Sequence, residues 1–97
     1  LFIRPTAGDI FDEIKISKYF VKRIKNKGVV LSNAKTSHSC FVLRGWDSIN
    51  QLLREVKRTQ SFNQSLKNFP KEKLLLDMLL IHRIVVPAAS NEEMPYL

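Results

Sequence analysis

The sequence predicts an α+β fold in which a three-stranded antiparallel sheet is followed by three helices. Short runs rich in aromatic and β-branched residues, separated by turn-forming residues, occupy the first half of the chain. Apolar residues at helical spacing fill most of the second half. The last helical run leads into Ile84-Val85-Val86-Pro87, which returns to the composition of a strand or wing. Together these observations favour a winged-helix-like layout.

The expected strands are Tyr19–Lys25, Val29–Asn33 and Cys40–Arg44. Between the first two, Asn26-Lys27-Gly28 is expected to form a hairpin turn in which the glycine adopts a positive φ. A polar loop leads to the third strand. Because neighbouring residues of a strand point to opposite faces, only one of Phe41 and Val42 is expected in the core.

The expected helices are residues 46–58, about 62–68, and 70 to 82 or 83. Ser48 with Gln51, and Ser61 with Gln64, each have the spacing of a capping box. Pro70 suits the first position of the third helix. The residues expected in the core, besides Phe41 or Val42, are Ile49, Leu53, Phe62 and Leu75.

The third helix is apolar around nearly its whole circumference. One expected stripe consists of Leu74, Leu75, Met78 and Ile81, and further leucines at 76, 79 and 80 widen it. A small domain cannot cover such a helix on all sides, so a partner, a neighbouring domain or a second copy is expected to cover part of it. The alternative cover is the N-terminal arm, residues 1–18.

The expected organisation is an N-terminal arm or linker (1–18), one domain (19–87) and a C-terminal tail or linker (88–97). Within the arm, Ile10, Ile14 and Ile16 share a strand parity, although Phe11 breaks it and leaves a helical turn as the alternative. The chain shows no apolar run of the roughly 20 residues that span a bilayer and no signal-peptide pattern at its start. With a single cysteine, Cys40, these features favour a cytoplasmic location.

The charge pattern points to an anionic partner. The net charge is +7, and between Ile14 and Ala89 fifteen basic residues stand against four acidic ones. Such a basic domain favours nucleic acid, an acidic peptide or a negatively charged surface. The alternative is a well-solvated surface without a specific partner.

The residues of the chain do not form a catalytic motif. There is no glycine-rich phosphate loop, and the adjacent acids Asp12 and Glu13 are not arranged for paired acid–base chemistry. His38 and Cys40 supply only two of the roughly four ligands that zinc prefers, so Cys40 is interpreted as a small apolar strand residue. We therefore expect neither an enzyme nor a cofactor or metal.

The pattern over about residues 19–86 resembles the PqqD-like peptide-recognition domains, the leader-peptide recognition elements of enzymes that modify ribosomally made peptides. The residues that carry the resemblance are Gly28-Val29-Val30-Leu31, Phe41-Val42-Leu43, Ile49, Leu52-Leu53 and the closing Ile84-Val85-Val86. One departure is Arg58-Thr59-Gln60, where the family often has an Asp-Gly pair after the first helix.

The resemblance implies that the leader of a precursor peptide adds as a strand beside residues 40–43, with its apolar side chains between that strand and the third helix. It implies an acidic, amphipathic peptide and a modifying enzyme, fused or separate, often a radical S-adenosylmethionine protein or a cyclodehydratase. The implied peptide-binding residues are Cys40, Phe41, Val42, Leu43, Arg44, Lys71, Lys73, Leu75, Met78, Leu79 and His82.

Two other functions remain open from the sequence. A winged-helix domain that binds nucleic acid suits the basic charge, although the leucine-rich third helix lacks the polar face of a recognition helix. A structural or dimerisation module suits the apolar third helix equally well.

Overall fold

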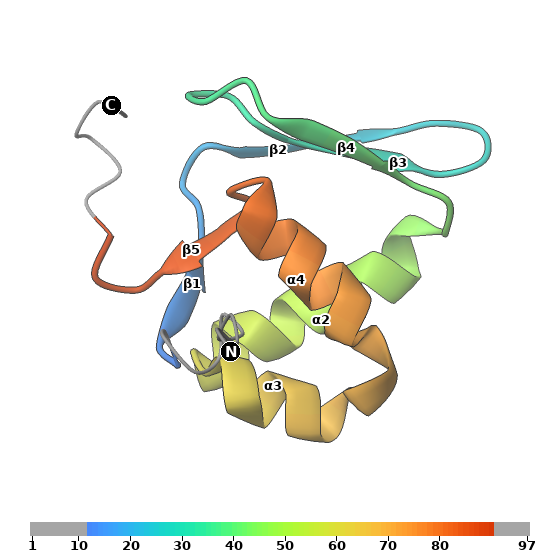
Figure 1. The fold of residues 1–97 in the computed structure, drawn as a ribbon. Coiled ribbons are helices and arrows are strands. Elements are labelled where there is room, and N and C mark those ends of the chain that lie inside the picture. Colours follow the sequence, from blue (N-terminus) through green and yellow to red (C-terminus); the bar gives the residue numbers. More distant parts are fainter. Residues whose placement is uncertain (1–11, 91–97) are drawn as a thin grey trace, which may run out of the picture.

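The computed structural model describes residues 12–90 and confirms the predicted α+β fold (Figure 1). The sheet has the order β2-β3-β4 and is antiparallel throughout. Its strands are β2 (Phe20–Ile24), β3 (Val29–Asn33) and β4 (Ser39–Val42). The helices are α2 (Trp46–Thr59), α3 (Phe62–Asn68) and α4 (Lys73–Ile81), with the short 3-10 helix η1 (Pro70–Glu72) before α4. All the helices lie on one face of the sheet.

A second antiparallel pair joins the two ends of the described chain. Strand β1 (Ile14–Ile16) pairs with β5 (Val85–Pro87), and the side chain of Ile14 is completely buried. Asp12 accepts hydrogen bonds from the Ser61 hydroxyl and the Asn63 N–H at the start of α3. The folded unit therefore includes residues 12–18, which the sequence assigned to an arm. Ile10 and Phe11 lie outside the described residues.

The sheet buries one face against the helices. On β3 the buried side chains are Val29, Leu31 and Asn33, and their partners on β4 are Val42 and Cys40. Val42 is buried while Phe41 is 51% exposed, so Val42 is the inward residue of that pair. The other predicted core residues, Ile49, Leu53, Phe62 and Leu75, are all buried.

Gly28 is required in the β2–β3 turn for a different reason from the predicted one. Its φ is not positive, so the expected left-handed glycine is wrong. A Cβ at this position would overlap the carbonyl oxygen of Val42 and lie 2.9 Å from the Phe41 ring. The glycine is needed because β4 and the Phe41 ring pass close to its backbone.

Only one of the two expected helix caps forms. Ser61 caps α3, since its hydroxyl accepts a hydrogen bond from the Gln64 N–H at 3.1 Å. The expected cap at Ser48 is wrong because Ser48 already lies in the first turn of α2, whose N-cap is Gly45 without a side-chain cap bond.

Helix α4 buries one apolar face and exposes another. Leu75, Leu76 and Leu79 are buried, whereas Leu74 is 83% and Ile81 is 70% exposed. These three residues lie within one turn and a half and form the buried face, so of the expected stripe only Leu75 belongs to the core. The described part of the N-terminal segment does not cover this exposed face, because β1 pairs with β5. Across residues 12–90, every helix is too short or too polar to cross a membrane.

Candidate functional site

Strand β4 presents an open edge. Asn33 donates its N–H to the His38 carbonyl at 2.8 Å, which sets the hydrogen-bonding phase of the β3–β4 ladder. In antiparallel pairing this phase alternates, so Cys40 and Val42 direct their backbone groups to β3, and Ser39 and Phe41 direct theirs to the opposite side. Among residues 12–90, no other strand pairs with that side. The outward N–H and C=O groups of Ser39 and Phe41 are therefore open to a further strand.

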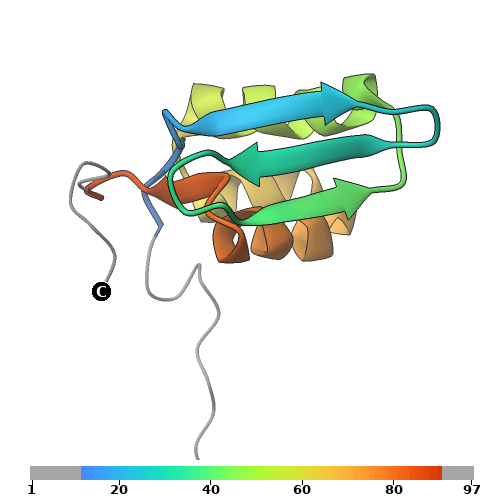
Figure 2. The ribbon, with the colours of Figure 1, turned by 90° about the horizontal axis from the view of Figure 1, so that it is seen from above.

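Helix α4 runs antiparallel to β4 beside this edge. Arg44, two residues after β4, pairs with Glu72 just before α4, with 2.6 Å between Nη1 and Oε2. At the other end, the rings of His38 and His82 meet edge to face with centroids 6.4 Å apart. These two contacts place the end of β4 near the start of α4, and the start of β4 near its end. Figure 2 shows α4 emerging from beneath the β4 edge of the sheet.

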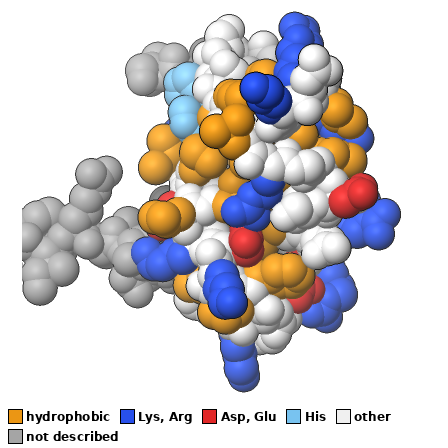
Figure 3. All heavy atoms as spheres, turned by 90° about the vertical axis from the view of Figure 1, so that its right-hand side faces the viewer, with side chains coloured by type: hydrophobic (Ala, Val, Ile, Leu, Met, Phe, Trp, Pro, Cys, Tyr) orange, Lys and Arg blue, Asp and Glu red, His pale blue; other side chains and the backbone are white. Residues whose placement is uncertain are grey.

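Apolar side chains are exposed on both sides of this junction. Leu43 is 75% exposed just after β4, and Leu74 and Ile81 are exposed on α4. Phe41 is half-exposed on the outer face of the sheet, and Met78 is half-buried. In Figure 3, hydrophobic side chains gather beside the pale blue histidine atoms, with Lys and Arg side chains around them. We call this region the β4–α4 surface. It consists of Ser39, Cys40, Phe41, Leu43, Leu74, Met78, Ile81 and His82.

The structure brings together only part of the predicted peptide-binding set. Cys40, Phe41, Leu43, Met78 and His82 lie on the β4–α4 surface and are at least partly exposed. Three predicted residues instead have their side chains in the core and offer the surface little or no area; they are Val42, Leu75 and Leu79.

The three predicted cations differ in their availability. Arg44 already pairs with Glu72, and Lys73 pairs with Asp77 at 3.2 Å. Lys71 is exposed and has no ion pair with the residues that the structure describes. Of the three, Lys71 is therefore the most available to an acidic peptide.

Sequence reasoning left Leu74, Ile81 and His38 out of the site. The first two belong to an all-round apolar helix, and only the packing of α4 decides which of its leucines face outward. His38 lies in a polar loop whose position relative to His82 depends on the tertiary fold. The available signal was the excess of apolar residues on α4, which predicted an uncovered face without locating it.

Cys40 does not have the environment of a reactive thiolate. Partial burial raises the pKa of its thiol above the ordinary value of 9.0, because desolvation disfavours the charged form. Within residues 12–90, the His, Cys, Asp and Glu side chains do not form a group of three that could hold a metal ion. The chemistry of this surface is therefore that of apolar side chains and free backbone groups.

No protein-family model, curated protein or solved structure matches this chain. The resemblance to the PqqD-like domains therefore stays a prediction from the sequence pattern.

Proposed function

We propose that this chain is a binding domain that captures the leader region of a ribosomally made precursor peptide, by adding the peptide as a strand to the edge of β4. The observation that carries this proposal is the uncharged open edge of β4 lying along an exposed apolar face of α4. Main-chain hydrogen bonds to Ser39 and Phe41 provide affinity, and side-chain contacts provide selectivity.

The alternation of a strand determines where the side chains of the peptide go. Every second side chain of an added strand points toward the helices, beside Met78 and the exposed Leu74 and Ile81. The intervening side chains point to the outer face of the sheet, beside Phe41. Apolar residues at alternate positions of the peptide suit these contacts, and Met78 adapts to side chains of different shape.

The opposite edge of the sheet supports the choice of β4. Edge strands in small proteins are usually protected from pairing by charged side chains. Strand β2 carries Lys22 and Arg23, both exposed, whereas β4 has the sequence Ser-Cys-Phe-Val without a charge. Strand addition is therefore favoured at β4.

The proposal assigns this chain no catalytic step. A fused or separate enzyme modifies the peptide, and this domain holds the leader for it in the cytoplasm. DNA recognition by α4 receives less support, because the exposed face of this helix carries Leu74 and Ile81, and its Lys73 is paired with Asp77.

Replacing Phe41 by proline tests strand addition directly. The Phe41 N–H points to the open edge, so Phe41→Pro removes a donor for the peptide without removing a β3–β4 hydrogen bond. Phe41→Ala is the matched control, since it loses the same ring but keeps the N–H. We expect a leader peptide encoded near the gene to bind the alanine variant more tightly than the proline variant, by calorimetry. Equal affinities of the two folded variants would contradict strand addition.

The side-chain contacts are tested by placing a charge on the surface. Leu74→Asp changes a residue that is 83% exposed and should leave the fold intact, whereas Ile24→Asp makes the same kind of change on β2, where the residue is 61% exposed. In a titration of isotope-labelled protein, peptide-induced NMR shifts should map to residues 39–44 and 71–83. We expect Leu74→Asp to weaken them and Ile24→Asp to leave them unchanged. Shifts centred on other residues would refute the proposed site.

A further inference from the structure

The β2 edge of the sheet, opposite to β4, carries a concentrated positive charge. All six of its residues are exposed, and they come from β2 and from the turn that follows it. None of its cations makes an ion pair with another residue in the described part of the chain. We name this region the basic corner, which consists of Val21, Lys22, Arg23, Ile24, Lys25 and Lys27.

In the described part of the chain, no acidic residue forms an ion pair with these cations. Of the four acids between Ile14 and Ala89, three form ion pairs elsewhere, namely Glu72 with Arg44, Glu55 with Arg58 and Asp77 with Lys73. Four cations within six residues repel one another, which disfavours the compact state. An anionic partner at the basic corner would relieve this repulsion.

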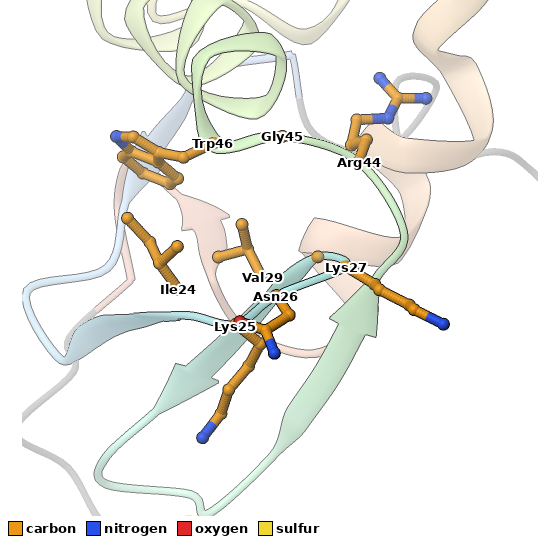
Figure 4. A pocket seen from close by; sticks show the side chains of 9 residues that line it. Ile24, Lys25, Asn26, Lys27, Val29, Arg44, Gly45 and Trp46 are labelled. Atoms are coloured by element: carbon orange, nitrogen blue, oxygen red, sulfur yellow. The ribbon is translucent and has the colours of Figure 1, made fainter.

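A pocket of about 180 Å³ opens beside the basic corner, between the β2–β3 turn and the start of α2. Figure 4 shows Ile24 and Val29 pointing toward Trp46 across the pocket, while the side chains of Lys25 and Lys27 extend away from it. The pocket thus combines apolar walls with a basic rim. It suits an apolar side chain that is flanked by acidic groups.

These features favour a protein surface over a nucleic acid. Single-stranded nucleic acids bind by stacking their bases on free aromatic rings. The Trp46 ring is already in use, because the Lys22 ammonium lies 3.9 Å from its centroid and Phe20 stacks on it at 6.4 Å. The exposed apolar residues of the basic corner are aliphatic, with Val21 at 47% and Ile24 at 61% exposure. An apolar centre within a polar rim is the usual arrangement of a protein–protein interface.

We propose that the basic corner and its pocket form a docking site for an acidic protein surface that inserts one apolar side chain beside Trp46. Strands β2 and β4 are opposite edges of the sheet (Figure 2), so this partner and a strand at β4 bind at the same time. The proposal is independent of peptide capture at β4, and the residues that test it lie outside the β4–α4 surface.

Trp46 provides a direct readout, since it is the only tryptophan of the chain and lines the pocket. The probe is a synthetic peptide of glutamates with one central leucine, and its binding is followed by Trp46 fluorescence in the full chain. The test variant is Arg23→Glu/Lys25→Glu. The control, Lys57→Glu/Lys67→Glu, makes the same change in net charge at exposed positions of α2 and α3.

We expect the test variant to weaken binding of the probe by about tenfold, because both charge contacts are reversed, and the control to change it less than about twofold. Ile24→Ala should also weaken it, because the apolar wall is lost. Equal losses in the test and control variants would overturn the proposal in favour of unspecific charge attraction. A probe that leaves Trp46 fluorescence unchanged would overturn it too. Tighter binding of a single-stranded DNA of equal length would overturn it as well, because it would indicate that the partner is a nucleic acid and not a protein.

Discussion

Arg44 and Glu72 form an ion pair, 2.6 Å between Nη1 and Oε2, that ties the residues after β4 to the helical turn before α4. The side chains are 36% and 20% exposed, so the pair is partly shielded from water. Together with the His38–His82 ring contact, it aligns β4 with α4 at both ends. Arg44, predicted to meet the peptide, thus has a structural partner within the domain.

A double-mutant cycle measures this pair. We expect Arg44→Ala and Glu72→Ala to lower the free energy of unfolding by up to about 1 kcal/mol each, as for other partly exposed ion pairs. The double variant should lose less than the sum of the two, since one interaction is removed twice. Urea denaturation measures all four proteins. Strictly additive losses would show that the ion pair contributes no stability.

Leu53→Ala tests the core against the exposed face of α4. Leu53 is 3% exposed on the buried side of α2, and truncating it should lower the free energy of unfolding by about 2–5 kcal/mol. Leu74→Ala removes the same atoms from a side chain that is 83% exposed and should change this free energy by less than about 0.5 kcal/mol. Denaturant unfolding of both variants checks the assignment. Similar losses at the two positions would mean that Leu74 is covered in solution.

Local patterns were sufficient to predict most elements of this fold. Turn residues and apolar periodicity located β2, β3, β4 and the helices to within one to three residues at each end. Strand pairings between segments that are distant in sequence could not be predicted in this way. The β1–β5 pair joins segments about 70 residues apart. Helix α4 has only two charged residues, Lys73 and Asp77, and its apolar residues occupy most of its circumference, so the pattern did not show which of its leucines face the core.

Asn33 shows the same limit for a polar residue. The sequence places it at the end of a strand beside a polar loop. In the fold its side chain donates to the Ser17 hydroxyl and the Arg83 carbonyl and accepts from the Lys35 and Thr36 N–H groups. Such a buried hub depends on three segments that meet only in the folded protein. For the candidate site, the sequence likewise predicted a strand edge and an apolar helix, but it did not identify Leu74 and Ile81 as exposed residues of that site.

Gly28→Ala tests the close approach of β4 to the β2–β3 turn. The added Cβ would overlap the backbone carbonyl oxygen of Val42. A backbone atom cannot move aside as the end of a flexible side chain does. We expect a loss of about 1–3 kcal/mol in the free energy of unfolding, as for other overpacked sites. Gly45→Ala is the control, because a Cβ there meets no atom within 4 Å. A Gly28→Ala protein as stable as the control would contradict this packing.

Cys40 should make the stability of the domain depend on alkaline pH. Its folded pKa is raised by burial above 9.0, so the folded state holds the thiol proton more tightly than the unfolded chain. The resulting stabilisation is fully present below pH 9.0 and is lost as the pH rises through the raised folded pKa. Unfolding of Cys40→Ala should therefore depend less steeply on pH above 9.0 than unfolding of the natural chain. Parallel curves would contradict the raised pKa.

Alkylation of Cys40 reports on occupancy of the β4 edge. Cys40 is half-buried on the helix-facing side of this edge strand, where side chains of an added strand would cover it. We expect iodoacetamide to react with it slowly at neutral pH, because the raised pKa leaves little thiolate. A saturating leader peptide should slow the reaction further in the natural chain and in Phe41→Ala, and should do so much less in Phe41→Pro. Mass spectrometry follows the single cysteine of the chain. If the bound peptide leaves the rate unchanged, then it binds away from β4, and the proposed site is wrong even where binding itself is tight.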